Sequence, residues 1–579
     1  MMPRTEVDYL KSWSVQKIAV VGPGIVGMPM AALLAHAKIM IGSDKPATVV
    51  VIQRHSKTSA WKVASINAGK SVIGGIEPDL DKIVSESVAG RVLSASHDYN
   101  QVSDADVILI CVQTDKKGLG PDYGPLMESL ESIATALVKK PAASRPLIIF
   151  ESTLAPSSMA TIIKDHFARF GLIDGQDILL GNSPNRVMPG RLVERVRGSD
   201  KVVGGLSAEA VQKIKLLYSH IVTTGALHVT NSFSAEIIKT LENAYRDVRI
   251  AFSAEIVRYC DEHDIDFYSV RDAVNARCEQ SDGASKDPNA VPSGGLLIPT
   301  IGVGGHCLPK DGILLLWRQI ESGADMSNSL ILQSRKINDE SPAETIRLAE
   351  RRFESLNGAA VALLGAAYRF NSEDTRNAPT LPLARLLLDK GCAVLVHDPY
   401  VKPDDQNIGK FDLRRYFSND LAKSLASVDY IIFCTAHRVY AEQARQIFAA
   451  SNRLKGVIDG CNMFPLKKTV ENGGMAYTGI GKGAGHPPAG FVEFVFESFR
   501  IVERGVANEV KRYVDFANQA YVLDDFNKVA FETVKQIART CVTGCAITDY
   551  GTIGKAPRFQ GFVSRLTLCA EKAGDLSAK

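Results

Sequence analysis

The sequence lacks the patterns that mark out several classes of protein. Its ten cysteines include no CxxC pair, so they predict neither a zinc knuckle nor a dense disulfide framework. No uninterrupted apolar run reaches the roughly 18 residues that a membrane-spanning helix needs. The first residues also lack the apolar core of a signal peptide. We therefore expect a cytoplasmic protein that has no metal site and no membrane partner.

An excess of charge of either sign is also missing. Lys and Arg number 67 and Asp and Glu number 64, which leaves a net charge of +3. This is not the strongly basic field of a nucleic-acid-binding protein. No short-period repeat or low-complexity tract is visible. What the sequence does have is length, because 579 residues predict three or four domains.

Most of the chain alternates short apolar strands with helical stretches. In the first half, such strands lie within residues 18–21, 48–54, 104–112, 144–153 and 176–184. In a second half they lie within 358–370, 392–400, 428–436 and 454–460. Strands separated by helices form βαβ units with parallel strands. The pattern predicts an α/β protein with two Rossmann-like, doubly wound parallel sheets.

Two helical regions complete the predicted architecture. From about Ser234 to His263, apolar residues recur at helical spacing without Pro or Gly, which predicts a long helix joining the two α/β halves. A loop rich in Gly, Pro and Ser follows at 281–311, and loops of this length are usually functional or disordered. After Gly490, apolar stripes predict a helix from about Val492 to Val510 and another at 525–541. These form a helical C-terminal extension.

A glycine turn follows the first strand. Gly22, Gly24 and Gly27 have the GxGxxG spacing, and Ile25 and Val26 complete the turn before a helix. The first glycine permits the tight turn, and the second lets a pyrophosphate approach the backbone. The third allows the helix to pack closely on the strand. The context predicts a dinucleotide-binding site.

The second strand ends in Gln53 and Arg54, where an Asp or Glu is expected to bind the adenosine ribose. Arg54 could hold a 2′-phosphate, which would indicate NADP. Alternatively, Gln53 hydrogen-bonds the ribose while Arg54 is solvated. We favour NAD and leave NADP open.

A second candidate site lies in the glycine-rich segment 302–311. Cys307 stands among the glycines, with His306, Lys310 and Asp311 nearby. Cationic neighbours or backbone dipoles make a cysteine thiolate available as a nucleophile. For a single cysteine, a small buried residue in a glycine turn is the commoner role, and we assign that role to the other nine cysteines.

Several motifs in this order resemble the UDP-glucose/GDP-mannose dehydrogenase family over about residues 15–485. The segments that carry the resemblance are GPGIVGMPMA, INAG…GIEPDL, ADVILICVQT, ESTLAP, NSPNRVMPG, AEIIKTLENAYR, GVGGHCLPKD, LGAAYRFNSEDTRNAP, HDPY and GIGKG. The resemblance implies NAD-dependent oxidation of a sugar-nucleotide C6 alcohol to a carboxylate in two hydride transfers. It makes Cys307 the nucleophile that holds the aldehyde.

The resemblance also implies roles for other residues. Lys239 and Asn243 would stabilise the substrate oxygen and order water, with Asp311 beside the cysteine and Thr153 binding water. The cofactor-binding set would be Gly22, Gly24, Ile25, Val26, Gly27, Gln53, Arg54, Thr114, Thr153, Lys310 and Arg376. The substrate-binding set would be Asn185, Arg186, Lys239, Asn243, Gly304 and Arg369.

The same resemblance divides the chain and suggests its assembly. It implies an NAD-binding domain at 15–228, a central dimerisation domain with the cysteine loop at 229–343, and a UDP-sugar-binding domain at 344–485. Residues 486–579 are then a helical extension of unknown role. The family form would be a homodimer or a larger homo-oligomer, with the central helix in the interface.

Two departures from the family pattern affect the expected chemistry. The family usually has a Glu that assists thioester hydrolysis at the position of Asn185, and Asn cannot accept a proton, so help worth roughly 10²–10⁴-fold could be lost. Slow hydrolysis, a substitute base such as Glu151, or a different product would each follow. Arg369 replaces a lysine of the family, which keeps the charge but changes its shape.

The substrate is indicated by the segments SPNRVMPG and ESTLAP. They resemble members that act on UDP-N-acetylhexosamines, so we expect UDP-N-acetylglucosamine or UDP-N-acetylmannosamine. Two alternatives stay open. One is a non-catalytic protein that binds nucleotide sugar and NAD as a scaffold or sensor. The other is a two-electron dehydrogenase of related fold, which would not need Cys307.

Overall fold

The computed structural model describes residues 10–574 except 76, 140–144, 188, 279–293, 354, 465–475, 523 and 541–546. The chain forms two compact units. Unit 1 combines residues 1–242, 314–324 and 510–544, and unit 2 combines 243–313, 325–509 and 545–579. Each unit is described by itself. The division into four domains at 228, 343 and 485 stays a prediction.

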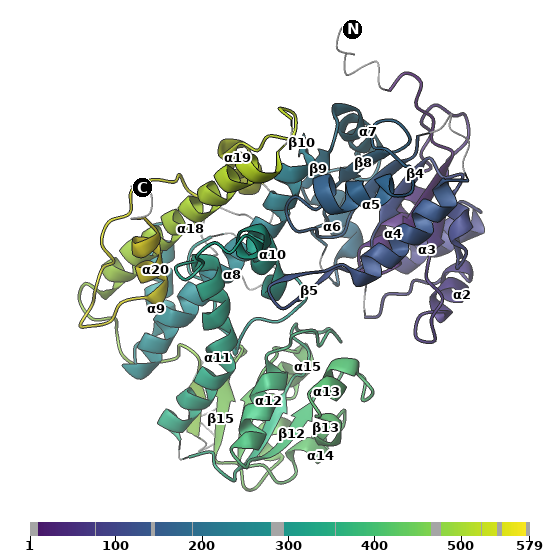
Figure 1. Cartoon of the computed structure of the whole chain (residues 1–579). Helices are drawn as coiled ribbons and strands as arrows, with labels where there is room; N and C mark the ends of the chain where they lie inside the picture. The colour runs from purple at the N-terminus through teal and green to yellow at the C-terminus, as the bar shows by residue number, and fades with distance from the viewer. Residues whose placement is uncertain are drawn as a thin grey trace. The chain divides into compact units, whose positions relative to one another are not determined.

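An eight-stranded sheet forms the centre of unit 1 (Figure 1), with the order β10-β9-β8-β7-β4-β1-β2-β3. From β3 to β8 the six main strands follow the order 3-2-1-4-5-6 of doubly wound dinucleotide-binding sheets. β9 runs antiparallel to β8. The strands are β1 (Lys17–Val21), β2 (Thr48–Ile52), β3 (Leu93–Ser96), β4 (Val107–Ile110), β7 (Leu147–Phe150), β8 (Leu179–Asn182), β9 (Lys201–Gly205) and β10 (Leu227–Asn231).

Helices cover both faces of this sheet, as parallel strands with apolar side chains on both sides require. Val20 and Leu109 pack on one face against α1, α3, α6 and α7, whereas Val21 and Ile110 pack on the other against α4 and α5. The helices are α1 (Gly27–His36), α3 (Leu80–Ala89), α4 (Gly124–Leu137), α5 (Lys164–Ala168), α6 (Leu192–Gly198) and α7 (Ala208–Ser219).

Unit 2 contains a second parallel sheet with the order β13-β12-β11-β14-β15-β16, which is again the order 3-2-1-4-5-6. Its core on one face is formed by strand residues such as Leu364 and Phe433 with Tyr440. The strands are β11 (Ala360–Leu364), β12 (Ala393–His397), β13 (Phe417–Ser418), β14 (Tyr430–Phe433), β15 (Gly456–Asp459) and β16 (Ala476–Gly479), and α12 (Thr380–Asp389) follows β11. The predicted pair of Rossmann-like sheets is confirmed.

The predicted long helix is α8 (Ser232–Glu262), which has 31 residues. Most of its side chains are buried, including charged ones such as Glu236, Asp247 and Glu255. A helix that is buried on most sides must give each buried charge a partner. The helices that follow are α9 (Phe267–Asn275), α10 (Leu308–Glu321) and α11 (Leu330–Arg352).

The predicted glycine-rich loop at 281–311 ends earlier than expected. Residues 279–293 lie outside the described residues, and α10 already begins at Leu308. The reason is local, because Pro309 follows the first helical residue and Asp311 lies in the first turn, and both favour a helix start.

The C-terminal extension is helical, as predicted, with α18 (Phe491–Tyr521), α19 (Phe531–Thr540) and α20 (Arg565–Gly574). The expected helix at 525–541 was wrong at its start. The Asn518 side chain donates to the Val529 carbonyl (2.7 Å) and accepts from the Val529 N–H (2.9 Å), which holds the preceding residues out of a helix.

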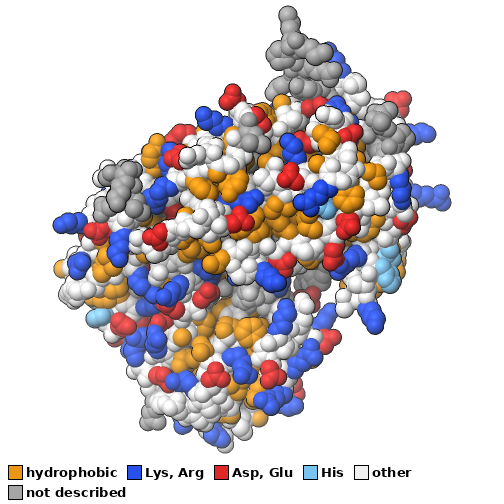
Figure 2. Space-filling model, in the orientation of Figure 1, with side chains coloured by type: hydrophobic (Ala, Val, Ile, Leu, Met, Phe, Trp, Pro, Cys, Tyr) orange, Lys and Arg blue, Asp and Glu red, His pale blue; other side chains and the backbone are white. Residues whose placement is uncertain are grey.

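The surface agrees with the small net charge. Basic and acidic side chains are intermixed over the face shown in Figure 2. Within the described ranges, no helix combines the length and the apolar character needed to cross a membrane. The same ranges contain no cluster of His, Cys, Asp and Glu side chains arranged to hold a metal ion.

Candidate active site

The glycine turn of unit 1 has the geometry that a pyrophosphate requires. Gly22 has φ +94°, and its N–H donates to the Ile52 carbonyl (2.9 Å). A Cβ on Gly27 would lie 2.1 Å from the Gly22 oxygen, so the close packing of α1 needs glycine there. A Cβ on Gly24 would meet nothing within 4 Å, which leaves one side of the turn open. The start of α1 has no side-chain cap, so its N–H groups fit an anionic ligand.

The residues after β2 favour NAD over NADP. The Gln53 side-chain amide donates to Ser59 Oγ (3.1 Å) and to the Arg54 carbonyl (2.9 Å). The Arg54 guanidinium forms an ion pair with Glu128 on α4, and both side chains are largely exposed. The cation that a 2′-phosphate would need is therefore already engaged by a carboxylate.

Thr114 and Thr153 connect two adjacent strand ends. Thr114 is buried after β4, and its hydroxyl donates to the carbonyl of Thr153, which follows β7 (2.7 Å). The carboxyl ends of neighbouring strands are where doubly wound sheets bind ligands. The two threonines thus lie at the expected edge of the sheet.

Asn185 belongs to a buried cluster around Glu151. The Lys201 ammonium lies 2.8 Å from a Glu151 oxygen and 2.8 Å from the Ser183 carbonyl. The Asn185 amide and the Tyr218 hydroxyl also donate to the same carboxylate. Burial raises the pKa of Glu151, and the Lys201 cation and these hydrogen bonds offset part of that rise.

The cluster around Glu151 shows whether Glu151 can act in place of the family's glutamate, whose position Asn185 occupies. Glu151 is 2% exposed and accepts from three donors, so its geometry does not favour it as a substitute base that activates water. Sequence reasoning missed Lys201 and Tyr218, because β9 and α7 are patterned there as ordinary buried elements. The available signal was a lysine, Lys201, directly beside the apolar residues of this strand.

Arg186 is held by the central helix. Its Nε lies 2.8 Å from both carboxylate oxygens of Glu242, and the two side chains are almost fully buried. Glu242 was not predicted as a site residue. Lys239 and Asn243 stand one turn apart on α8, on one face, as their spacing predicts.

In unit 2, Cys307 stands directly before α10. Its carbonyl accepts from the N–H groups of Lys310 (3.1 Å) and Asp311 (2.9 Å) in the first helical turn. The thiol is half-buried. Gly305, with φ +89°, donates its N–H to the Arg376 carbonyl (2.8 Å). The cysteine loop is therefore tied to the loop that carries Arg376.

The predicted residues next to Cys307 interact with one another. Asp311 is fully buried, and its two oxygens lie 2.6 Å from Lys310 Nζ and 2.6 Å from Asn243 Nδ2. Lys310 is also buried. Asp311 therefore orients the Asn243 amide, and the Lys310 ammonium balances its charge. Charge-assisted hydrogen bonds of this kind hold side chains firmly in place.

Tyr368 is a neighbour of the cysteine loop that the sequence did not reveal. A Cβ on Gly304 would lie 2.4 Å from the Tyr368 Cβ, so only glycine fits against this ring. Burial raises the pKa of Tyr368 to about 12. The glycine spacing was the only available signal for Tyr368.

The two predicted arginines of the loop after β11 both contact neighbouring residues. Arg376 Nε donates to Asp374 (2.9 Å), and Arg369 lies over the Phe370 ring with 5.1 Å to its centroid.

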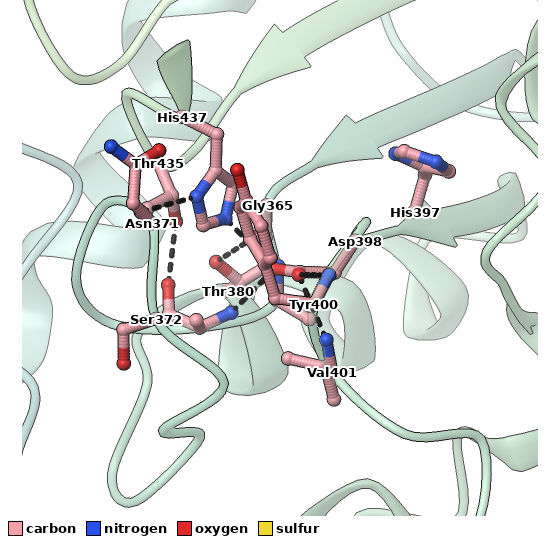
Figure 3. A network of polar contacts seen from close by, with 12 residues as sticks. Gly365, Asn371, Ser372, Thr380, His397, Asp398, Tyr400, Val401, Thr435 and His437 are labelled. Atoms are coloured by element: carbon pink, nitrogen blue, oxygen red, sulfur yellow. Dashed lines mark hydrogen bonds and ion pairs between the residues drawn. The ribbon is translucent and has the colours of Figure 1, made fainter. Parts of the chain in front are cut away.

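A buried network fixes the loop after β11, which carries Arg369 and Arg376 (Figure 3). Asp398 accepts from the N–H groups of Ala366 (2.8 Å) and Ala367 (3.0 Å), and His437 Nε2 lies 3.0 Å from the same carboxylate. The Asn371 N–H points to His437 Nδ1 (2.8 Å), so the ring proton lies on Nε2. Burial alone would raise the pKa of Asp398, but these hydrogen bonds and the His437 ring hold it below its usual value.

The other cysteines do not share the position of Cys307. All eight cysteines within the described residues are free thiols, and Cys541 and Cys545 lie outside them. Burial raises the pKa of the Cys111, Cys434 and Cys461 thiols. These three suit packing rather than nucleophilic chemistry.

Comparison with known proteins places these features in a family. Models of the UDP-glucose/GDP-mannose dehydrogenase family match its NAD binding domain at residues 16–222, its central domain at 233–340 and its UDP binding domain at 362–465. The UDP-N-acetyl-D-mannosamine dehydrogenase of Pyrococcus horikoshii is 29% identical over 472 residues, which cover 81% of this chain and 99% of that protein.

Solved structures agree with this assignment. The UDP-D-ManNAc dehydrogenase from Pyrococcus horikoshii matches with a TM-score of 0.67 and 28% identity, covering 81% of this chain and all of that one. The NDP-N-acetyl-D-galactosaminuronic acid dehydrogenase from Methanosarcina mazei Go1 matches with a TM-score of 0.65 and 30% identity, covering 83% and 98%. The chain therefore belongs to the UDP-glucose/GDP-mannose dehydrogenase family and is an NAD-dependent nucleotide-sugar dehydrogenase.

Proposed function

We propose that the chain oxidises the C6 alcohol of UDP-N-acetylmannosamine to the carboxylate through a covalent intermediate on Cys307. The observation that carries this proposal is the position of the half-buried Cys307 directly before α10, beside the Lys310–Asp311–Asn243 cluster. The substrate is inferred from relatives named as UDP-N-acetyl-D-mannosamine dehydrogenases. UDP-N-acetylglucosamine is the other candidate from the sequence.

The proposed reaction balances over two oxidations. NAD⁺, when bound, accepts a hydride in each of them. The C6 alcohol first loses a hydride and a proton and becomes an aldehyde. The Cys307 sulfur then bonds to the aldehyde carbon and forms a thiohemiacetal, which loses the second hydride and a proton to become a thioester. Water breaks the C–S bond and releases the carboxylate and the thiol.

The neighbours of Cys307 have distinct proposed roles. Asn243, oriented by Asp311, donates to the oxygen that carries charge in the thiohemiacetal. Lys239, one turn earlier on α8, supplies the cation for that oxygen. Arg376 belongs to the cofactor site, and Thr114 and Thr153 order the edge of the NAD-binding sheet. Arg186 and Arg369 are proposed ligands of the nucleotide sugar.

The test counts NADH for each sugar consumed over a panel of UDP- and GDP-sugars. We expect two NADH from UDP-N-acetylmannosamine and much lower turnover of the other sugars. Cys307→Ala should abolish acid formation. Cys569 on α20 is half-buried like Cys307 and offers a matched control, so Cys569→Ala should retain both NADH formation and acid formation. One NADH per sugar would identify a two-electron enzyme, and binding without NADH would identify a scaffold.

A further inference from the structure

The C-terminal extension repeats three of the four helices that begin at residue 232, because α8, α9 and α11 have counterparts there and α10 has none among the described residues. α8 and α18 each have 31 residues. Each is followed by a short helix, α9 with nine residues and α19 with ten. Both short helices begin with Phe, any residue, Ser or Thr, and Val, at Phe267 and at Phe531. A later helix follows in both cases, with Ser329 before α11 and Ser564 before α20.

The two long helices also align in sequence without a gap. The pattern Glu-x-x-Arg-Tyr-x-Asp occupies residues 255–261 of α8 and residues 509–515 of α18. The offset that pairs Glu255 with Glu509 also pairs Tyr245 with Phe499. Identical residues at this offset are Arg246 and Arg500, Val248 and Val502, Glu255 and Glu509, Arg258 and Arg512, Tyr259 and Tyr513, and Asp261 and Asp515.

The matching glutamates make matching contacts within unit 2. Glu255 accepts from the Ser564 hydroxyl (2.7 Å) and from the N–H groups of Arg565 (2.9 Å) and Leu566 (3.2 Å) at the start of α20. Glu509 accepts from the Ser329 hydroxyl (2.5 Å) and from the N–H groups of Leu330 (3.0 Å) and Ile331 (3.3 Å) at the start of α11. Each glutamate thus caps the helix that belongs to the other copy.

Contacts between the long helices have the same symmetry. In unit 2, Tyr259 stacks on Phe491 with 5.1 Å between ring centroids, and Phe252 lies 5.8 Å from Phe499. Tyr245 hydrogen-bonds Glu503. Later residues of α8 therefore meet earlier residues of α18, so the two helices are antiparallel. Reciprocal contacts between matching residues are what a two-fold axis produces in a homodimer interface.

A loop in each copy has glycines at the same spacing. Gly302 has φ +151° and Gly551 has φ +156°. In both segments, another glycine stands three residues later, at Gly305 and at Gly554. Two residues beyond, the first copy has Cys307 and the second has Ala556. The second copy therefore lacks the thiol at the matching position.

We propose that the extension is a degenerate second copy of the central helical segment, and that it binds α8 in the manner of a second subunit within one chain. The chain segment that leads into α18 lies beside the end of α8, so the two helices pair within one chain. Gly485 is hydrogen-bonded to Asp264 and Asp266 just beyond the end of α8, and α18 begins at Phe491. The surface of α8 that two chains would otherwise share is thus covered by the chain's own α18 and α20.

The proposal predicts a monomer, in contrast to the homodimer that the family resemblance suggested. It does not depend on the substrate or on the role of Cys307. Sedimentation of the full chain from nanomolar to tens of micromolar concentration should give one species of about 62.7 kDa throughout. A dimer that persists on dilution would overturn the proposal.

Substitution of the two glutamates tests the symmetry of the interface. Glu255→Gln and Glu509→Gln, each in the full chain, should lower Tm by similar amounts, about 2–4 °C, because each removes a charged cap from the helix of the other copy. Glu497→Gln is the matched control, since Glu497 lies on α18 with its side chain 45% exposed. The proposal fails if Glu509→Gln behaves like this control, or if only one of the two caps affects Tm.

Discussion

Asn185 changes what the buried centre of unit 1 can do. Its amide donates to Glu151, whose other partners are Lys201 and Tyr218. An amide has no basic lone pair at neutral pH, and Glu151 is closed off from solvent. In the proposed mechanism, therefore, no carboxylate of this cluster assists the water that attacks the thioester.

We expect thioester hydrolysis to be the slow step. Rapid mixing of enzyme, NAD and excess sugar should give a burst of about two NADH per chain and then slower steady-state turnover. Stopped-flow absorbance at the NADH band measures both phases. Cys307→Ser should show no burst of this size, and a linear wild-type trace from the first turnover would contradict the prediction.

Asp398 makes the free energy of unfolding depend on pH in the acid range. Because its folded pKa lies below the usual value of about 3.9, the folded state binds fewer protons than the unfolded chain as pH falls. Its contribution is fully present above about pH 4 and is lost as pH falls through the folded pKa. Asp398→Asn should cost about 1.5–3 kcal/mol of unfolding free energy at pH 7, because several hydrogen bonds to a carboxylate are weakened.

Urea unfolding at pH 7 and at pH 3.5 measures this effect. The difference between wild type and Asp398→Asn should be smaller at the lower pH. Asp420→Asn, at a solvent-exposed helix cap in the same domain, is a suitable control for the loss of an acidic side chain. A difference that stays constant with pH would show that Asp398 does not titrate as described.

At the scale of elements, the glycine turn separates folding from cofactor binding. A Cβ at position 24 meets open space, whereas one at position 27 would lie 2.1 Å from a carbonyl oxygen. Gly24→Ala should keep Tm near the wild-type value and weaken NAD binding by about tenfold or more. Gly27→Ala should lower the unfolding free energy by about 1–3 kcal/mol.

Calorimetric titration with NAD and thermal unfolding distinguish the two variants. The pair serves as its own control, because both add one methyl group to the same turn. Equal loss of stability in both variants would show that the open side of Gly24 is not a ligand surface.

Elements were more predictable than the contacts between them. The short apolar runs and the glycine turn predicted both parallel sheets, because burial on two faces leaves a continuous apolar pattern in each strand. Apolar residues at helical spacing predicted α8. Short edge strands such as β3 and β13 carry no such pattern and were missed. The contacts of Glu242 with Arg186, of Lys201 with Glu151 and of Tyr368 with Gly304 each join residues distant in sequence, and spacing alone could not assign these partners.

The repeat of α8 in α18 was also missed from the sequence. Its identities are few and lie 254 residues apart, and at most other aligned positions of the two helices the residues differ, many of them by exchange of one apolar residue for another. The reciprocal glutamate caps made the relation visible, because they depend on contacts between the copies and not on sequence spacing.

At the scale of the whole molecule, the two sheets share a strand order but differ in their first turn. In unit 1, a short glycine turn joins β1 to α1, whereas in unit 2 the longer loop 365–379 joins β11 to α12. Only the first has the open glycine geometry that a pyrophosphate needs. The second copy of the central segment has Ala556 in place of the cysteine.

One NAD and one nucleotide sugar should therefore bind to each chain. Titration calorimetry of the Cys307→Ala variant, which should bind both without completing the reaction, should give a stoichiometry of one for each ligand. A stoichiometry of two for NAD would mean that the second sheet also binds the dinucleotide.

The pairing of α8 with α18 has a consequence for how this enzyme can change. In a symmetric homodimer, every substitution at the interface appears on both sides at once, so a new charge or cavity is always met by its own duplicate. Here each side is encoded separately, and a change in α18 leaves α8 as it was. Glu255 and Glu509 persist on both sides, while Cys307 and Ala556 have diverged. When two copies are joined in one chain, the copy with Cys307 can keep the reactive residues, while the copy with Ala556 needs to keep only the residues that pack against the first.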